Sequence, residues 1–278
     1  MKKSKEKRKM LIFETHFHIN QNENSEKYVT ESMNIGVACL LAVAADRESC
    51  DTSLAMSEKF DNVFCSIGIH PHDAEEIFEN ISDIKKLAKS GKCIAIGETG
   101  LDYFYENTDR KLQKRAFEVH LELALTLNLP VIVHCRDRDC VFDAYADSYG
   151  MLREFSNAGG RFVIHCFTGD TDYAGKFLDL GAYIGVTGIV TFPKAENVRE
   201  IVRYVPVENL LLETDAPYLA PKPFRGKENH SKYLPYIADA VAVEKGVTSD
   251  ALCLKTFKNA LDLFKKAESF RKLVQDEG

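Results

Sequence analysis

From residue 11 onward, the chain alternates short apolar runs with longer amphipathic stretches. The short runs are rich in Val, Ile, Leu and Cys, which is typical of buried β-strands, whereas the longer stretches have the 3.6-residue period of helices. The apolar runs predict eight strands, at 11–18, 36–45, 63–70, 93–98, 130–135, 161–166, 182–187 and 209–215. Strands separated by helices in this way indicate parallel βα units.

The amphipathic stretches predict a helix after each strand, with further helical pattern at 249–273. These helices are expected at 24–33, 52–60, 74–90, 109–128, 138–157, 171–179, 195–204 and 231–245. Eight such units predict an α/β fold, a closed (β/α)₈ TIM barrel in a single domain. A doubly wound sheet is the less favoured alternative, because it usually has fewer strands and often a glycine-rich phosphate loop. No GxGxxG or GxxxxGK[ST] follows any of these strands.

Composition is consistent with one large folded unit. Of the 278 residues, 45% are hydrophobic and 28% charged, which is enough to bury a sizeable core. The longest apolar run, at 35–45, is shorter than the roughly 18 residues that a membrane span needs, so no membrane segment is expected.

The N-terminus and the cysteines both favour a cytoplasmic protein. Residues 1–10, MKKSKEKRKM, lack the apolar core of a secretory signal and are expected to form a basic flexible tail before a barrel domain at 11–278. The eight cysteines form no CxxC, and most lie in apolar runs, which predicts reduced, buried thiols.

Polar side chains interrupt the apolar runs at one end of the strands. In FETHFH, at 13–18, the polar residues occupy alternate positions and are expected on one face of a strand. Further polar residues end later strands, so that the set comprises His16, His18, Glu98, His134, His165, Glu213 and Asp215. Because the carboxyl ends of parallel strands meet at one mouth of a barrel, we expect these side chains to converge there.

Such a cluster predicts bound metal. Burying several ionisable groups without partners is costly, and a divalent cation would satisfy them. Imidazole and carboxylate ligands favour zinc or another first-row ion, and Mg or Mn is also compatible. Since one ion takes three or four protein ligands, the set divides between two cations, with Glu98 as the natural bridge. Cations would also supply local positive charge in a chain whose net charge is −6.

Three polar residues are not expected to bind metal. Glu14 lies two residues deeper than His16, about 7 Å along a strand, and is predicted to orient a ligand histidine rather than to bind metal. Glu213 stands in the same relation to Asp215 and receives the same interpretation. His120 lies within a helical pattern and is expected to be structural or exposed.

The motifs that carry these residues resemble the TatD family of metal-dependent deoxyribonucleases, within the amidohydrolase-like barrels. The resemblance extends from residue 11 to about 264. Its segments are ETHFH, GIHPHD (68–73), IGETGLDY (96–103), VIVHCRD (131–137), VIHCFTG (163–169), YIGVTGIVTF (183–192), LLLETDAPYLAP (210–221) and RGKENH (225–230).

The resemblance implies a cytoplasmic hydrolase that uses two divalent cations (Zn, Mg or Mn) to cut phosphodiester bonds, often from the 3′ end of DNA. The first cation would be held by His16, His18, Glu98 and Asp215, and the second by Glu98, His134 and His165. DNA ends or short single strands would be the partner, with no membrane and no obligate protein partner evident.

The resemblance also implies substrate contacts. His70 and His72 would lie over the phosphate or the attacking water, and Arg136 and Arg225 could contact phosphate. The alternatives are that the two histidines cap the loop around Pro71 and that the arginines are surface ion-pair partners. Among aromatic residues, the candidates for base stacking, or alternatively for lid packing, are Tyr103, Phe104, Tyr105 and Phe167.

The chain departs from the family pattern at two places. Glu14 stands where the family usually has Asp. In the loop at 225–231, His230 replaces an acidic residue and Ser231 a proline, which bears on substrate preference rather than on metal chemistry.

The expected reaction is attack on phosphorus by a water that two cations activate, with Asp215 as ligand and proton acceptor and with Glu98 and His70 completing the catalytic set. A rival hypothesis keeps the metals and changes the bond, giving an amidase, lactonase or aminoacyl-ester deacylase. A third hypothesis is a non-catalytic metal-binding protein.

Overall fold

Eight parallel strands form the centre of the computed structural model, which describes residues 10–19, 24–105 and 108–275. The strands pair in chain order, each with the next, as expected for a barrel. They are β1 (Ile12–Phe17), β2 (Val37–Val43), β3 (Val63–Ile67), β4 (Cys93–Asp102), β5 (Val131–Arg136), β6 (Phe162–Ile164), β7 (Tyr183–Val186) and β8 (Leu210–Leu212).

The barrel closes between β1 and the segment that follows β8. Asp215 N–H donates to the carbonyl of His16 at 2.9 Å, and His18 N–H donates to the carbonyl of Ala216 at 2.7 Å. A parallel bridge joins Phe17 to Ala216. The first strand is therefore tied to the last along the stretch that carries the predicted metal ligands.

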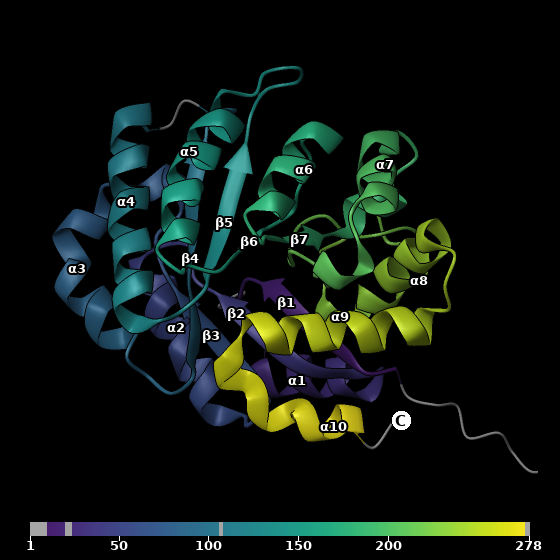
Figure 1. Ribbon diagram of the computed structural model, residues 1–278. Helices are drawn as coiled ribbons and strands as arrows, with labels where there is room; N and C mark the ends of the chain where they lie inside the picture. Colours follow the sequence, from purple (N-terminus) through teal and green to yellow (C-terminus); the bar gives the residue numbers. More distant parts are fainter. Residues whose placement is uncertain (1–9, 20–23, 106–107, 276–278) are drawn as a thin grey trace, which may run out of the picture.

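Helices surround the strands (Figure 1). They are α1 (Ser25–Asn34), α2 (Arg47–Lys59), α3 (Glu76–Leu87), α4 (Arg110–Leu127), α5 (Asp143–Asn157), α6 (Thr171–Asp179), α7 (Glu196–Tyr204), α8 (Leu234–Lys245), α9 (Ser249–Leu263) and α10 (Lys272–Gln275). The predicted single-domain (β/α)₈ barrel is confirmed. Among the described helices, none has both the length and the hydropathy needed to cross a bilayer.

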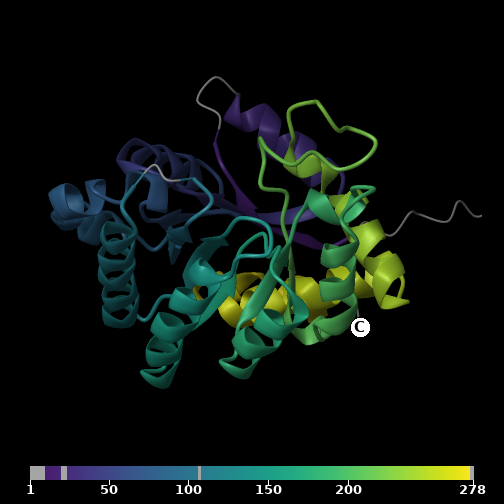
Figure 2. The ribbon, with the colours of Figure 1, turned by 90° about the horizontal axis from the view of Figure 1, so that it is seen from above.

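Helix α9 lies across the barrel instead of alongside a strand, as Figures 1 and 2 show in yellow. Its Phe257 packs 5.8 Å from the Phe13 ring, and the Phe264 ring that follows it lies 6.0 Å from Phe13. These aromatic rings form one buried cluster with inward residues of most strands, including Leu41 and Ile132. The helix therefore fills the barrel from one end and leaves the opposite end for the polar side chains.

Several boundaries differ from the sequence-based prediction. Helix α2 begins at Arg47 instead of residue 52, because the Asp46 carboxylate accepts the Ser49 N–H at 2.7 Å and the Ser49 hydroxyl accepts the Asp46 N–H. Strand β4 continues past Glu98 to Asp102, whereas β6 and β8 are short. His165, Glu213 and Asp215 consequently follow their strands instead of ending them.

Strand β1 does not follow the simple alternation predicted for it. Its register against β2 shifts between Glu14 and Phe17. Phe13 belongs to the interior cluster, whereas Phe17, four residues later, packs in the outer layer against Tyr28 of α1. An uninterrupted strand would keep both rings on one face. The shift allows Glu14 and His16 to have different surroundings.

Candidate metal centre

Four candidate ligand atoms lie together at the open end of the barrel, from β1 and the residue that follows it, from β4 and from the segment after β8. Glu98 Oε2 is 3.4 Å from His16 Nε2 and 3.5 Å from His18 Nε2. Asp215 Oδ1 lies 3.6 Å from His18 Nε2 and 3.9 Å from His16 Nε2. A tetrahedral cation with bonds of about 2.1 Å separates its ligand atoms by about 3.4 Å. The histidine-to-carboxylate spacings are close to this value, and the ligand atoms of His16, His18 and Asp215 all lie within 4.8 Å of one another.

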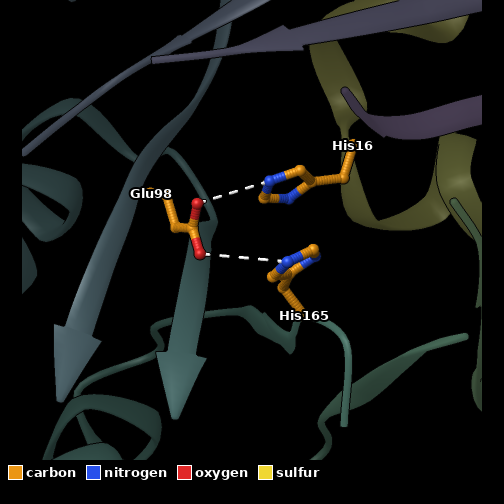
Figure 3. Close-up of side chains that lie close together, drawn as sticks. All are labelled: His16, Glu98 and His165. Atoms are coloured by element: carbon orange, nitrogen blue, oxygen red, sulfur yellow. Dashed lines mark ion pairs between the residues drawn. The ribbon is translucent and has the colours of Figure 1, made fainter. Parts of the chain in front are cut away.

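The other carboxylate oxygen of Glu98 faces a second group of donors. Glu98 Oε1 lies 2.9 Å from His134 Nδ1 and 3.9 Å from His165 Nε2. Figure 3 shows the two oxygens of Glu98 turned apart, one toward His16 and one toward His165. A carboxylate in this position can contribute one oxygen to each of two cations.

The second group is larger than the sequence predicts, because His70 also reaches it. His70 Nε2 lies 4.0 Å from Glu98 Oε1, as near as His165 does. The donors of His70, Glu98 and His134 are all within 4.8 Å of one another. His165 lies equally close to the first group, since its Nε2 is 3.7 Å from Asp215 Oδ1.

Contacts at the far nitrogen of three histidines determine which nitrogen faces the pocket. His18 Nδ1 donates to the carbonyl of Val43 at 3.0 Å, which leaves Nε2 as the nitrogen that faces the pocket. His165 Nδ1 lies 2.8 Å from Glu213 Oε1, which again leaves Nε2. His134 is reversed, because a carboxylate faces its Nε2 and Nδ1 points at Glu98.

The carboxylate behind His134 belongs to Asp102, a residue that the sequence analysis missed. Asp102 Oδ2 lies 3.0 Å from His134 Nε2 and 3.1 Å from His72 Nε2. Its other oxygen accepts the backbone N–H of Phe104 at 2.9 Å and of Tyr105 at 3.0 Å. The sequence does contain a signal for Asp102, because it lies four residues after Glu98. If the strand is extended past residue 98, both side chains point to the same face of the sheet.

A glycine between these two acids lets β4 approach β5 closely. Gly100 has a φ of +141°, and a Cβ there would lie 2.0 Å from the carbonyl oxygen of His134. Any side chain at this position would push β5 away. The close approach brings Asp102 within hydrogen-bond distance of His134.

Electrostatics in the pocket favour anionic carboxylates. Burial by itself would raise the pKa of Glu98, but His16 and His165 outweigh it and hold this pKa well below its usual range. Burial lowers the pKa of His134, yet Asp102 and Glu98 together raise it to about 9. The buried donor set, which combines imidazole nitrogens with anionic oxygens, fits a first-row divalent cation or Mg²⁺.

Glu14 acts on the backbone of the site instead of on an imidazole. One of its oxygens accepts the N–H of His16 at 3.2 Å and of Thr214 at 2.9 Å, and the other accepts the Thr214 hydroxyl at 2.7 Å. Burial raises the pKa of Glu14 to about 8, although these donors act in the opposite direction. The carboxyl group thus connects the backbone of β1 at His16 to the backbone at Thr214, next to Asp215, and both His16 and Asp215 are predicted ligands.

Glu213 contacts the site directly. Its Oε1 accepts the Cys166 N–H at 2.7 Å in addition to facing His165. Both Cys166 and Asp215 have left-handed backbone, with φ of 46° and 58°, a conformation that costs a non-glycine residue roughly 1–3 kcal/mol. The Cys166 N–H bonds Glu213 and the Asp215 N–H bonds the His16 carbonyl, so each turn is held by a contact to another segment of the chain.

His70 both caps the loop around Pro71 and faces the pocket. His70 Nδ1 accepts the N–H of His72 at 3.2 Å, which caps the short 3₁₀ turn Pro71–Asp73, while its Nε2 faces Glu98. Burial lowers the pKa of His70 to about 3. A neutral His70 at the pocket mouth remains able to accept or donate a hydrogen bond.

The two arginines stack on aromatic rings. The Arg136 guanidinium lies 4.2 Å from the Phe104 ring and 4.9 Å from the Tyr105 ring, and that of Arg225 lies 3.9 Å from the Phe192 ring. Arg136 is the last residue of β5 and belongs to the rim of the pocket. Its phosphate contact, like that of Arg225, remains a prediction.

Aromatic residues near the pocket divide into buried and exposed ones. Tyr103 and Phe167 are buried and pack inside, as the lid-packing alternative held. Tyr105 is 43% exposed, and its ring lies 5.4 Å from that of His72. Tyr218, which the sequence analysis did not single out, is 62% exposed, and its ring lies 6.2 Å from that of His18. The sequence could have indicated Tyr218, because it lies only three residues after the predicted ligand Asp215.

His230, where the chain departs from the family pattern, packs against α1 at the edge of the site. Its ring stacks on Tyr28 at 3.9 Å, and its Nδ1 accepts the Lys232 N–H at 3.0 Å. The neighbouring Ser231 hydroxyl is 2.7 Å from the Tyr28 hydroxyl. The substitution therefore couples the loop to α1 through a ring stack.

His120 is structural, as expected, and gives the protein a measurable acid sensitivity. Its Nδ1 donates to the Ala116 carbonyl at 2.7 Å, and its Nε2 accepts the N–H of Ile69 at 3.0 Å. Burial lowers its pKa to about 4, so the folded protein holds it neutral. An unfolded histidine titrates near 6.5, so the unfolded chain binds the extra proton between these values.

We therefore expect His120 to remove stability as the pH falls from about 6.5 toward 4, because protonation favours the unfolded chain in that range. In His120→Gln, the loss of unfolding free energy between pH 7 and 4.5 should be smaller than in the wild type by about 2 kcal/mol. Urea denaturation at the two pH values measures it. Equal losses in both proteins would contradict the assignment.

Comparison with known proteins gives consistent results. The family model described as TatD related DNase matches residues 13–265. The uncharacterized metal-dependent hydrolase YcfH of Escherichia coli K12 is 45% identical over 206 residues, which cover 73% of this chain and 74% of YcfH. The protein of Pantoea vagans named 3′-5′ ssDNA/RNA exonuclease TatD is 34% identical, with 87% of this chain and 94% of that protein covered.

Among solved structures, the TatD homologue YjjV of E. coli K12 superposes with a TM-score of 0.83 at 26% sequence identity. The alignment covers 91% of this chain and 98% of YjjV. A TatD family hydrolase from Entamoeba histolytica, at 19% identity and a TM-score of 0.77, has the same fold.

Proposed function

This chain belongs to the family of TatD related DNases and is a metal-dependent hydrolase, and we propose that it uses two cations to hydrolyse phosphodiester bonds at the 3′ ends of single-stranded DNA. The observation that carries the proposal is the position of the Glu98 carboxylate between two groups of donor atoms. Its two oxygens face separate sets of donors, 3.4 Å from His16 on one side and 2.9 Å from His134 on the other.

We assign the donor residues to two cations. His16, His18 and Asp215 would hold the first with one oxygen of Glu98, and His134 and His165 would hold the second with the other oxygen. Cations bound there would lower the pKa of water and offset charge on the phosphate oxygens.

The chain's own groups orient the substrate and move the proton. Asp215 takes the proton from the attacking water, since its Oδ1 borders both donor sets, 3.6 Å from His18 and 3.7 Å from His165. His70 and His72 hydrogen-bond the phosphate from the loop above Glu98, and Arg136 and Arg225 contact phosphates farther from the cleaved bond. Asp102 keeps Nδ1 of His134 directed at the pocket.

A single strand fits the surroundings of the pocket better than a duplex. With a net charge of −6, the chain has little long-range attraction for a polyanion, which disfavours sliding along DNA. Tyr105 and Tyr218 offer exposed rings next to pocket histidines, and unpaired bases can stack on such rings. Relatives named as 3′-5′ ssDNA/RNA exonucleases support the same substrate.

Tyr218 gives this substrate class a direct test. Stacking of a base on an aromatic ring is worth about 1–3 kcal/mol, so Tyr218→Ala should lower kcat/KM on a single-stranded oligonucleotide about tenfold. Tyr218→Phe should retain most of the activity. Tyr204→Ala, which removes a comparably exposed ring from α7, is the matched control and should have no effect. A small phosphodiester that lacks a base should be cleaved equally by the wild type and the three variants. If Tyr218→Ala cleaves the oligonucleotide as fast as Tyr204→Ala does, or is also slower on the small phosphodiester, Tyr218 does not stack on a base of the substrate.

All eight cysteines are free thiols, which supports a reducing, cytoplasmic setting for this reaction.

The proposed function is tested by incubating the purified protein with 3′-labelled single-stranded DNA and Mg²⁺, Mn²⁺ or Zn²⁺, beside ester and amide substrates. We expect release of nucleotides from the 3′ end, which a chelator stops and added metal restores. Hydrolysis of the ester or amide with no cleavage of DNA would show that the activated water attacks carbonyl carbon instead of phosphorus, and would contradict the proposed nuclease function.

A further inference from the structure

Cys166 presents a thiol to one side of the metal centre. Its sulfur and one ligand atom each from His165 and Asp215 all lie within 4.8 Å of one another. The residue is partly accessible, in contrast to the six fully buried cysteines in the described part of the chain. Three different kinds of donor, a thiol, an imidazole and a carboxylate, therefore face the same small volume.

The thiol is held there by the surrounding turn. Cys166 has a φ of 46°, and its N–H donates to Glu213, the same carboxylate that faces His165. Its sulfur lies 3.3 Å from the Thr187 hydroxyl. A Cβ at the neighbouring Gly185 would lie 2.4 Å from Glu213 Oε1, so the absence of a side chain there makes room for the carboxylate that fixes the turn.

The thiol distinguishes this donor set from the proposed catalytic set, which contains only imidazole and carboxylate groups. Thiolate sulfur is a soft ligand that selects Zn²⁺ and heavier thiophilic cations, whereas Mg²⁺ and Mn²⁺ prefer oxygen. We propose that Cys166, His165 and Asp215 form a site for soft divalent cations, Cd²⁺ or excess Zn²⁺, that shares two residues with the proposed catalytic centre and inhibits it when filled. The inhibition rests on the proposed function, but the binding does not.

Filling the site is a simple exchange. The S–H bond of Cys166 breaks, its proton goes to the buffer, and a bond from sulfur to the cation forms, with no change of oxidation state. Because His165 and Asp215 cannot serve both arrangements at once, the soft cation withdraws them from the catalytic set.

The test is a titration of the Mg²⁺-loaded full-length protein with CdCl₂, followed by the ultraviolet charge-transfer absorbance of the thiolate-to-cadmium bond. Cys140 is the exposed cysteine of the described residues and supplies the matched control. The absorbance should persist in Cys140→Ser and disappear when Cys166→Ser is added to that variant. In the same titration, the Cd²⁺ concentration for half-inhibition, measured relative to each variant's own rate in Mg²⁺, should rise about tenfold or more in Cys166→Ser.

Retention of the absorbance in the double variant Cys140→Ser/Cys166→Ser, or its loss in Cys140→Ser, would overturn the site. If Cys166→Ser does not fold, cadmium X-ray absorption of Cys140→Ser decides the question, because one sulfur ligand supports the site and a shell of nitrogen and oxygen alone rejects it. The absorbance and the DNA assay are separate readouts. A thiolate signal in a protein that cleaves no DNA would refute the proposed nuclease function and leave the cation site standing.

Discussion

Replacing Glu98 by glutamine should reduce kcat/KM on single-stranded DNA by about a thousandfold or more. The carboxylate places one oxygen 3.4 Å from His16 Nε2 and the other 2.9 Å from His134 Nδ1. An amide of the same shape provides one oxygen and one NH₂ group, and the NH₂ cannot bind a cation. Loss of about 4 kcal/mol of stabilisation of the transition state corresponds to that factor.

The measurement combines steady-state rates with the metal content of the dialysed protein, which should fall from two cations to one or none. Glu196→Gln is the matched control, because Glu196 is an exposed acid on α7 that pairs with Arg199 and Arg203. It should retain both activity and metal. A Glu98→Gln protein with two bound cations and normal rates would refute the bridging role.

The second large effect is expected for Asp102→Asn, which changes the tautomer of a predicted ligand. Asp102 Oδ2 accepts from His134 Nε2, so Nδ1 is left free to bind a cation. An asparagine that keeps the backbone contacts of Phe104 and Tyr105 would present its NH₂ group to His134 instead. His134 would then accept at Nε2 and carry its proton on Nδ1, directed at Glu98.

We therefore expect Asp102→Asn to lose one of the two cations and roughly 10- to 100-fold in activity, the usual range for removing a partner of a metal-bound histidine. Raising the metal concentration should recover part of the rate, which a merely misfolded protein would not do. Asp147→Asn removes another acid of the same barrel, one that bonds the Tyr103 hydroxyl, and should change neither property. Equal metal content in the wild type and Asp102→Asn would show that the carboxylate does not control His134.

Together the two substitutions separate direct metal binding from the positioning of a ligand. Glu98→Gln should impair both cations, because its oxygens face both donor sets. Asp102→Asn should impair only the cation on the side of His134. Loss of both cations from Asp102→Asn as well would not be compatible with two distinct sites.

The fold and most of the donor set could be predicted from the chain alone because both depend on local pattern. Alternation of apolar runs with helical periodicity specifies parallel βα units, and the carboxyl ends of parallel strands must share one end of a barrel. His16, Glu98, His134 and His165 therefore converge, although up to 149 positions separate them in the sequence.

Details that depend on register and on short segments could not be predicted. The shift in β1 separates the surroundings of Glu14 from those of His16, and no pattern of apolar and polar residues shows where a strand slips. The extension of β4 to Asp102 depends on Gly100, whose missing side chain lets two backbones approach. Helix α9, which reads as an ordinary amphipathic helix, fills one end of the barrel because its Phe257 packs against Phe13.

The sequence by itself determined the architecture, the end of the barrel that carries chemistry, and the kinds of ligand found there. Only the tertiary structure decided which nitrogen of each histidine faces the pocket, that Asp102 stands behind His134, and that His70 and Cys166 border the predicted ligands. The physical reason is the distance along the chain over which each kind of information acts. Periodicity reports on neighbours a few residues apart, whereas tautomers and ligand distances depend on atoms of other strands to within a few tenths of an ångström.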